Sequence, residues 1–132
     1  MKVLALDYGR ARTGVAVSDP TGTLARPLCV VAGAGGDDGL ERLAALIEEE
    51  RAERVVVGLP LTLAGDHGEQ ARETEGFVYA LRARTSVPVV TFDERFTTDL
   101  AQQGSSASSD EDARAAAHLL SSYLTWLSGA RA

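Results

Sequence analysis

Four carboxylates in this sequence stand where secondary-structure elements should begin or end: Asp7, Asp93, Glu94 and Asp112. The first three follow apolar runs typical of strands, and the fourth opens an alanine-rich segment typical of a helix. Carboxylate oxygens are the hard ligands that Mg²⁺ and Mn²⁺ prefer. Two such ions about 3.5–4 Å apart can activate a water molecule and stabilise the leaving oxygen of a phosphodiester. Gathered in one place, these acids would therefore support metal-dependent cleavage of a nucleic acid.

The elements around these acids predict an α/β fold. Apolar runs predict strands over residues 1–6, 15–19, 24–31, 54–59 and 87–92, and helical spacing predicts helices from residue 40 onwards and over residues 71–81 and 110–127. A short helix is expected from Thr97 or Thr98 to Gln103. Three strands in a meander, followed by alternating helices and strands, indicate a mixed five-stranded sheet with helices on both faces. We expect residues 1–132 to form a single domain.

The strand order predicts where the acids meet. Ligands of such sheets gather beyond the carboxyl ends of the parallel strands, which is where Asp7, Gly58 and the Asp93-Glu94 pair are expected. Adjacent strand residues point to opposite faces, so only one of Asp93 and Glu94 should face the metals. In a purely structural interpretation, Asp93 would start a turn and Glu94 would pair with Arg95.

Two further strand features help to order the sheet. The β-branched run Val55–Val57 is typical of a central strand buried on both faces. Pro27 cannot donate a hydrogen bond to a neighbouring strand, which indicates that residues 24–31 form an edge strand.

The other candidate residues also have structural explanations. Asp7 could simply initiate the turn after its strand. Ser109 to Asp112 resembles a capping box, in which Asp112 would satisfy a helix amide, and Thr97 or Thr98 could be caps as well. Considered alone, a cap is the simpler interpretation of Asp112. These alternatives stay open at the level of sequence.

The composition is that of an ordinary globular protein. Of the 132 residues, 45% are hydrophobic and 24% are charged, which is typical of that class. No apolar stretch approaches the roughly 18 residues needed to cross a bilayer, and no signal peptide is apparent. The lone Cys29 fits a reducing compartment. We therefore expect a cytoplasmic protein without a membrane partner.

The placement of charge matters more here than the net charge of −6. A net negative protein does not bind nucleic acid by bulk charge alone. Yet 12 of the 13 basic residues are Arg, whose planar fork suits phosphate oxygens. Arg10 and Arg12 flank the first turn, and Arg95 follows the second acidic pair, so local contacts to phosphate are expected there. Tyr123 and Trp126 are too isolated to predict a base-stacking surface.

Four ordered motifs resemble one family, and together they span nearly the whole chain. Residues 7–19 (Asp-Tyr-Gly-Arg-Ala-Arg-Thr-Gly-Val-Ala-Val-Ser-Asp) resemble the first motif of the YqgF/RuvX family, and residues 57–61 (Val-Gly-Leu-Pro-Leu) resemble its second. Residues 93–98 (Asp-Glu-Arg-Phe-Thr-Thr) resemble its third, and residues 112–117 begin a segment similar to the terminal helix that carries the last acid. Members are small bacterial proteins described as Holliday junction resolvases and as pre-16S ribosomal RNA nucleases.

The resemblance implies an RNase H-like fold and metal-dependent cleavage of a phosphodiester. By position, Asp7, Glu94 (or Asp93) and Asp112 would correspond to the family's acidic triad. They would hold Mg²⁺ or Mn²⁺, which generates hydroxide and neutralises charge in the transition state. The residues implied in binding nucleic acid are Arg10, Arg12, Gly58, Arg95, Thr97 and Thr98.

The task implied is 5′-end processing of pre-16S ribosomal RNA during ribosome biogenesis, with Holliday junction resolution in DNA recombination and repair as the alternative. The implied partners are structured RNA or branched DNA, together with ribosome-assembly factors, and we expect a monomer or a weak homodimer. One departure concerns residues 102–109, which carry no cation, whereas family members often have Lys and Arg there. Weak, salt-sensitive or partner-dependent binding is therefore expected.

Two other classes of function compete. A strand, an Asp-x-Gly turn and a returning strand also open the actin-like ATPases and sugar kinases, although those proteins usually need two such domains around a cleft. The other competitor is a non-catalytic module that keeps the fold and docks on ribosomal or transcription machinery. ATP hydrolysis would favour the first class, and an Asp7→Asn protein that still performs the cellular task would favour the second.

Overall fold

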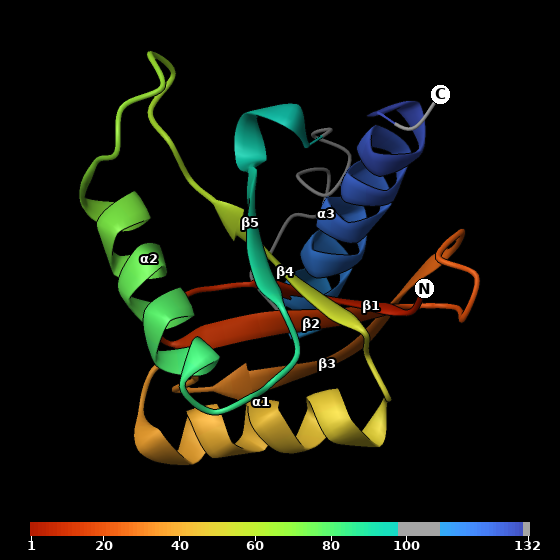
Figure 1. Cartoon of the computed structure of the whole chain (residues 1–132). Coiled ribbons are helices and arrows are strands. Elements are labelled where there is room, and N and C mark those ends of the chain that lie inside the picture. The colour runs from red at the N-terminus through yellow and green to blue at the C-terminus, as the bar shows by residue number, and fades with distance from the viewer. Residues whose placement is uncertain (98–108, 131–132) are drawn as a thin grey trace.

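The computed structural model describes residues 1–97 and 109–130, apart from the side chains of residues 109, 110 and 130. These residues form five strands, three α-helices and one 3₁₀ turn (Figure 1). In chain order they are β1 (Val3–Asp7), β2 (Arg12–Ser18), β3 (Ala25–Ala32), α1 (Asp37–Glu49), β4 (Arg54–Leu59), α2 (Glu69–Arg82), β5 (Val89–Asp93), η1 (Glu94–Phe96) and α3 (Ser109–Ala130). Within these ranges, none of the helices combines the length and the apolar character that crossing a bilayer requires.

The five strands form one mixed sheet, as predicted, and their order in it is β3-β2-β1-β4-β5. β1, β2 and β3 are antiparallel neighbours, whereas β4 lies parallel to both β1 and β5. The carboxyl ends of β1, β4 and β5 therefore meet at one edge of the sheet. This edge carries Asp7, Gly58 and the Asp93-Glu94 pair.

The residue types of β4 and β3 explain their places in the sheet. The run Val55–Val57 is fully buried because β4 is paired on both sides and covered on both faces. β3 lies at the edge, where Pro27 is tolerated. The register of β2 against β3 shifts between Val15 and Ala16, beside Pro27. The predicted central strand and the predicted edge strand are both confirmed.

Alternating side chains divide the interior into two cores. One core contains Leu4 and Leu6 of β1 and packs against α1 and α2. The other contains Val3 and Ala5 of β1 and packs against α3. Figure 1 shows α1 and α3 on opposite sides of the sheet. Because side chains alternate along a strand, Asp7 continues the series of Val3 and Ala5 and belongs to the α3 face.

Small residues let α3 lie close to β2. Ala113 and Ala116 of α3 are buried. A Cβ atom added to Gly14 of β2 would lie only 1.9 Å from the carbonyl oxygen of Asp112. Gly14 is also the residue that pairs with Asp7 across β1 and β2. The close approach therefore brings the start of α3, with Asp112, near Asp7, which is the first candidate metal ligand.

Some boundaries differ from those predicted. β2 begins at Arg12 rather than at residue 15, because its first residues pair with neighbours without following an apolar pattern. α1 begins at Asp37, ahead of its first apolar residue. Asp37 and Asp38 lie in its first turn, where negative charge interacts favourably with the positive end of the helix dipole. Beyond Thr97, the predicted short helix to Gln103 lies outside the described residues.

Replacing Gly14 by Ala should destabilise the protein. The added methyl group would overlap the backbone of Asp112, and overpacking of this kind typically costs about 1–3 kcal/mol. We expect a melting temperature lower by roughly 4–15 °C, measured by circular dichroism. Gly76→Ala in α2 is the matched control, because open space surrounds its Cβ position, and it should leave the melting temperature unchanged or slightly raised. Equal melting temperatures for Gly14→Ala and the wild type would contradict the close packing of α3 on β2.

Candidate active site

The end of β1 fixes Asp7 on the α3 face of the sheet. Its neighbour Tyr8 packs against the opposite core, where its ring stacks on Phe77 of α2 with centroids 4.3 Å apart. The hairpin that follows is tied by Thr13, whose hydroxyl lies 3.4 Å from both the amide nitrogen and the carbonyl oxygen of Gly9. Tyr8 and the hairpin thus hold the backbone that orients Asp7.

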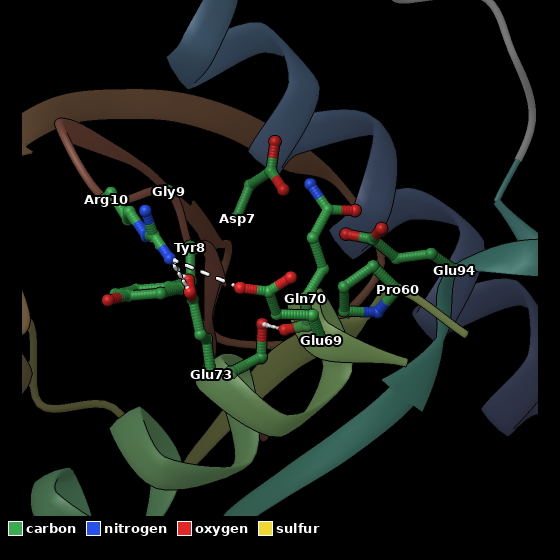
Figure 2. Close-up of a pocket in the computed structure, with 10 residues that line it drawn as sticks. Asp7, Tyr8, Gly9, Arg10, Pro60, Glu69, Gln70, Glu73 and Glu94 are labelled. Carbon is green, nitrogen blue, oxygen red and sulfur yellow. Dashed lines mark hydrogen bonds and ion pairs between the residues drawn. The ribbon is translucent and has the colours of Figure 1, made fainter. Parts of the chain in front are cut away.

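Glu94 reaches Asp7 across the strand that separates them. Gly58 of β4 lies between the ends of β1 and β5, and a Cβ atom there would lie 2.6 Å from Glu94 Oε1. The Glu94 side chain occupies this space, and its carboxyl group hydrogen-bonds with that of Asp7. Figure 2 shows both groups at the same pocket. Gly58, which the resemblance places among the nucleic-acid contacts, here makes room for a carboxyl group.

Burial and mutual repulsion keep a proton on this pair. Burial raises the pKa of Asp7; the hydrogen bond with Glu94 opposes that rise, and the charge of Asp112 adds to it. The pKa of Glu94 is raised to about 7, first by burial and then by the charge of Asp7 and the hydrogen bond to Asp7. Near neutral pH the two carboxyl groups therefore share a proton unless a cation replaces it.

Asp112 comes to this pair from α3. It is the fourth residue of the helix, and its Oδ2 atom lies 2.9 Å from Arg12 Nε. The N–H of Arg12 does not point at that oxygen, which is buried and accepts no hydrogen bond from any described residue. The carboxylate thus lies against Arg12 rather than over the end of the helix, which does not favour the capping-box interpretation. Arg12, a candidate contact to phosphate, is held in this ion pair.

The carboxylate oxygens of these acids are the type of ligand that a hard divalent cation prefers, although the three side chains do not converge on one point in this structure. Within residues 1–97 and 109–130, no three Asp, Glu, His or Cys side chains are grouped so that they could hold a metal ion. Two features still favour a cation here: the raised pKa values of the Asp7–Glu94 pair, and the buried Asp112 Oδ2 without a hydrogen-bond donor among the described residues. Buried carboxylate oxygens of this kind are stabilised by a bound cation. Asp7, Glu94 and Asp112 are the residues that would hold it.

Asp93 is turned away from this pair and stabilises η1. Its Oδ1 accepts a hydrogen bond of 2.9 Å from the backbone nitrogen of Arg95. The guanidinium of Arg95 binds the same carboxylate, with 2.6 Å between Nη2 and Oδ2, and this lowers the pKa of Asp93. Of the two acids that sequence left open, the structure brings Glu94 to Asp7. Strand alternation gives the same result, because Phe92, two residues earlier, is buried under α3.

Of the two threonines of the third motif, only Thr97 lies within the described residues. Thr97 ends η1, and its amide donates a hydrogen bond of 3.0 Å to the carbonyl oxygen of Glu94. Its hydroxyl is buried and finds no hydrogen-bond partner among the described residues. Thr98 lies outside the described residues.

An open pocket separates the acid pair from α2 (Figure 2). It is lined by the end of β1, the hairpin, the loop after β4, α2 and η1, with the residues Asp7, Tyr8, Gly9, Arg10, Pro60, Glu69, Gln70, Glu73, Thr74 and Glu94. Arg10 bridges to α2, where its Nε lies 3.0 Å from Glu73 Oε2 and its Nη2 lies 3.9 Å from Glu69 Oε1. This hydrogen bond lowers the pKa of Glu73. Arg10, like Arg12 and Arg95, is paired with a carboxylate.

Sequence reasoning missed the part that α2 plays in the pocket. Glu69, Gln70, Glu73 and Thr74 all line it, and Figure 2 shows the Gln70 side chain directed towards the acid pair. Their spacing places them on one face of a helix. That helix follows the loop at the carboxyl end of β4. These two signals together could have identified the face.

The prediction that Tyr123 and Trp126 are isolated is wrong. Their rings lie 6.1 Å apart, and both contact Phe92 of β5, at 5.5 Å and 5.8 Å between centroids. Phe96 of η1 lies 6.0 Å from the same ring. Phe96 could have been noticed because it follows Glu94 by two residues, but contacts between β5 and α3 leave no sign in the sequence.

A mixed sheet with this strand order and acids gathered at the carboxyl ends of β1 and β5 defines an RNase H-like nuclease fold. A solved structure with the same fold is that of T. thermophilus RuvC in complex with a Holliday junction substrate. It has a TM-score of 0.60, covers 98% of this chain and 96% of its own chain, and shares 18% sequence identity.

The chain belongs to the family described as "RuvX: Holliday junction resolvase", which matches residues 1–126. A relative from Chloroflexus aggregans, named "Putative pre-16S rRNA nuclease", is 44% identical over 101 residues, which is 76% of this chain and 71% of that protein. A relative of the same name from Anaeromyxobacter sp. (strain Fw109-5) is 41% identical over 132 residues, covering 94% of this chain and 96% of that protein. The resemblance carried by the four motifs is confirmed.

Gly58→Ala should separate Glu94 from Asp7 while leaving the fold intact. The new Cβ atom would lie 2.6 Å from Glu94 Oε1 and 2.9 Å from Glu94 Cγ. Because a flexible side chain can move aside, we expect a stability change within about 1 kcal/mol. Without its burial against Asp7, the pKa of Glu94 should fall from about 7 towards 4.5, as followed by NMR titration of the side-chain carboxyl carbon. A Glu94 pKa that stays near 7 in this variant would contradict the proposed role of Gly58.

Glu94→Gln should stabilise the metal-free protein more at pH 8 than at pH 5. The pKa of Glu94 is about 7 in the folded chain against an ordinary value of 4.5. Between these values the folded state keeps a proton that the unfolded state releases, so wild-type stability falls as the pH rises. Gln cannot lose a proton, and the difference should reach about 1–3 kcal/mol in denaturant unfolding.

Asp93→Asn is the control, for which we expect the opposite effect on stability at pH 8. Because Arg95 lowers the pKa of Asp93, removal of that carboxylate should destabilise the protein at pH 8 and matter less in acid. If the wild type and Glu94→Gln show the same pH dependence of stability, the Asp7–Glu94 pair does not share a proton in the folded state.

Proposed function

We propose that this protein is a metal-dependent endonuclease that processes the 5′ end of pre-16S ribosomal RNA. The observation that carries the proposal is the contact between two half-buried carboxyl groups, those of Asp7 and Glu94, at the open edge of the sheet. Such a pair opposes folding at neutral pH, and pKa values raised in this way cluster at functional sites. The close packing of Gly14 against the backbone of Asp112 brings the third acid, Asp112, towards this pair.

Asp7, Glu94 and Asp112 would hold Mg²⁺ or Mn²⁺. Once bound, the cation supplies activation of a water molecule and neutralisation of the charge that develops on the phosphate. Glu94 releases its shared proton on binding, which leaves all three side chains as carboxylates. The Tyr8–Phe77 stack and the hairpin keep Asp7 in place throughout.

Arg12 and Arg10 are the cations that we propose to meet the substrate. Each is now bound to a carboxylate, Arg12 to Asp112 and Arg10 to Glu73. A phosphate oxygen competes for the same guanidinium groups. In the proposed exchange, Arg12 leaves Asp112 free to serve as a ligand, and Arg10 turns from α2 towards phosphate in the pocket. Arg95 remains with Asp93 and keeps η1 in shape.

The names of the relatives favour RNA as the substrate. The Anaeromyxobacter protein, which matches 94% of this chain, is named for pre-16S rRNA, whereas the family description names the Holliday junction. The Holliday junction is therefore the second candidate. Because the chain carries a net charge of −6, we propose that ribosome-assembly factors add contacts to the RNA. Such work takes place in the cytoplasm, and trimming one RNA end does not need a symmetric dimer.

The test is cleavage of 5′-labelled pre-16S rRNA by the purified protein, followed on gels. Cutting should require Mg²⁺ or Mn²⁺ and stop in EDTA. Asp7→Asn, Glu94→Gln and Asp112→Asn should each lower the rate by at least about 100-fold. Asp93→Asn is the matched control, because this neighbouring carboxylate faces Arg95, and it should keep most of the activity. Equal rates for Asp7→Asn and the wild type would contradict the assignment of the site.

The same panel separates the rival functions. Preference for a four-way DNA junction would assign the second candidate. Tight ATP binding or ATP hydrolysis would favour an actin-like domain, and normal 16S rRNA maturation in cells carrying only Asp7→Asn would favour a non-catalytic module. Absence of metal-dependent cutting of both RNA and DNA at low salt would overturn the nuclease proposal.

A further inference from the structure

Four aromatic residues from three elements gather on the α3 face, next to η1. We call them the aromatic cluster: Phe92 of β5, Phe96 of η1, and Tyr123 and Trp126 of α3. Phe92 is the central ring, with centroid distances of 6.0 Å to Phe96, 5.5 Å to Tyr123 and 5.8 Å to Trp126. Tyr123 and Trp126 are stacked at 6.1 Å with 26° between their planes. The cluster is therefore one continuous arrangement of rings.

The cluster has a buried half and an exposed half. Phe92 and Tyr123 are 4% and 3% exposed, whereas Phe96 and Trp126 are 60% and 51% exposed. The two inner rings thus support the two outer rings from below. The other large hydrophobic residues that are exposed in the described ranges, Leu24, Leu63 and Tyr79, take no part in the ring contacts of this cluster. Single exposed apolar residues are ordinary, but supported groups of them indicate a binding surface.

The position of the cluster relates it to the acid pair. Phe96 and Glu94 belong to the same three-residue turn, η1. Phe92, which lies under Phe96, is on the same face of the sheet as Asp7 and Gly58. A nucleic acid strand with a phosphate at Asp7 and Glu94 that continues along η1 therefore meets the exposed rings within a few nucleotides.

We propose that Phe96 and Trp126 bind an unpaired base that flanks the bond to be cut. This inference rests on the proposed function and narrows its substrate to RNA that is single-stranded at one side of the cleavage point. Aromatic side chains stack on any base, and such stacking is worth about 1–3 kcal/mol per base. Bases inside a duplex are already stacked on their neighbours, so sequence-tolerant stacking of this kind selects unpaired nucleotides.

Trp126 is the only tryptophan of the chain, so its fluorescence reports directly on the cluster. The experiment titrates the full-length protein with a short unstructured RNA and, separately, with a blunt RNA duplex of the same length. Both titrations are made at low salt, with Mg²⁺ and with EDTA. We expect saturable quenching of Trp126 by the unpaired RNA and little or none by the duplex.

Substitution of Phe96 provides the second measurement. Phe96→Ala should weaken binding of the unpaired RNA roughly 5- to 100-fold, and Phe96→Tyr should retain it. Tyr79→Ala is the matched control, because Tyr79 is 79% exposed on α2 and lies outside the cluster, and it should bind like the wild type. The melting temperature of each variant shows whether the ring matters for the fold instead.

The outcomes separate this proposal from the nuclease proposal. Quenching by unpaired RNA with loss in Phe96→Ala supports the base-binding surface even if no substrate is cut. Metal-dependent cutting without any change in Trp126 emission overturns the surface and leaves the nuclease intact. Wild-type RNA affinity in Phe96→Ala, with a lowered melting temperature or without one, also overturns it, as does equal quenching by the duplex.

Discussion

The structure depends on holding two half-buried carboxyl groups together at one edge of the sheet. Asp7 ends β1 and Glu94 begins η1 directly after β5. They meet across β4, which lies between these two strands, because Gly58 has no side chain there. Burial raises the pKa of both groups; the contact with Asp7 adds to the rise for Glu94, whereas the hydrogen bond with Glu94 opposes it for Asp7. A pair of this kind must keep a proton or share a cation. The well-filled cores on the two faces of the sheet supply the stability that tolerates it.

The helix α3 connects this pair to the rest of the chemistry. Gly14 lets the helix backbone approach β2, so Asp112 comes near Asp7 while Arg12 balances its charge. The same helix later contributes Tyr123 and Trp126 to the aromatic cluster. Acid ligands and a base-binding surface can therefore lie along one helix and one sheet face. The acidic and aromatic groups would act on neighbouring parts of one nucleic acid strand.

Local sequence patterns were sufficient to predict most of the strands and helices. The strand predicted over residues 54–59 has the same bounds as β4, and Pro27 correctly indicated the edge strand. Alternation predicted that only one of Asp93 and Glu94 would face the site, and the structure shows that it is Glu94. Contacts between side chains far apart in the sequence could not be predicted. Arg10 binds Glu73, 63 residues away, and such contacts depend on how helices cross the sheet rather than on any spacing within a segment.

We infer that acids from β1, η1 and α3 form one site for a divalent cation. A crystal structure of the protein soaked with Mn²⁺ near pH 8, with anomalous diffraction data, tests it most directly. We expect an anomalous peak contacted by Asp7, Glu94 and Asp112, with Asp112 released from Arg12. The proposed site would be contradicted if, at saturating Mn²⁺, Asp7 and Glu94 stayed hydrogen-bonded to each other with no peak beside them, or if the ion bound elsewhere on the chain.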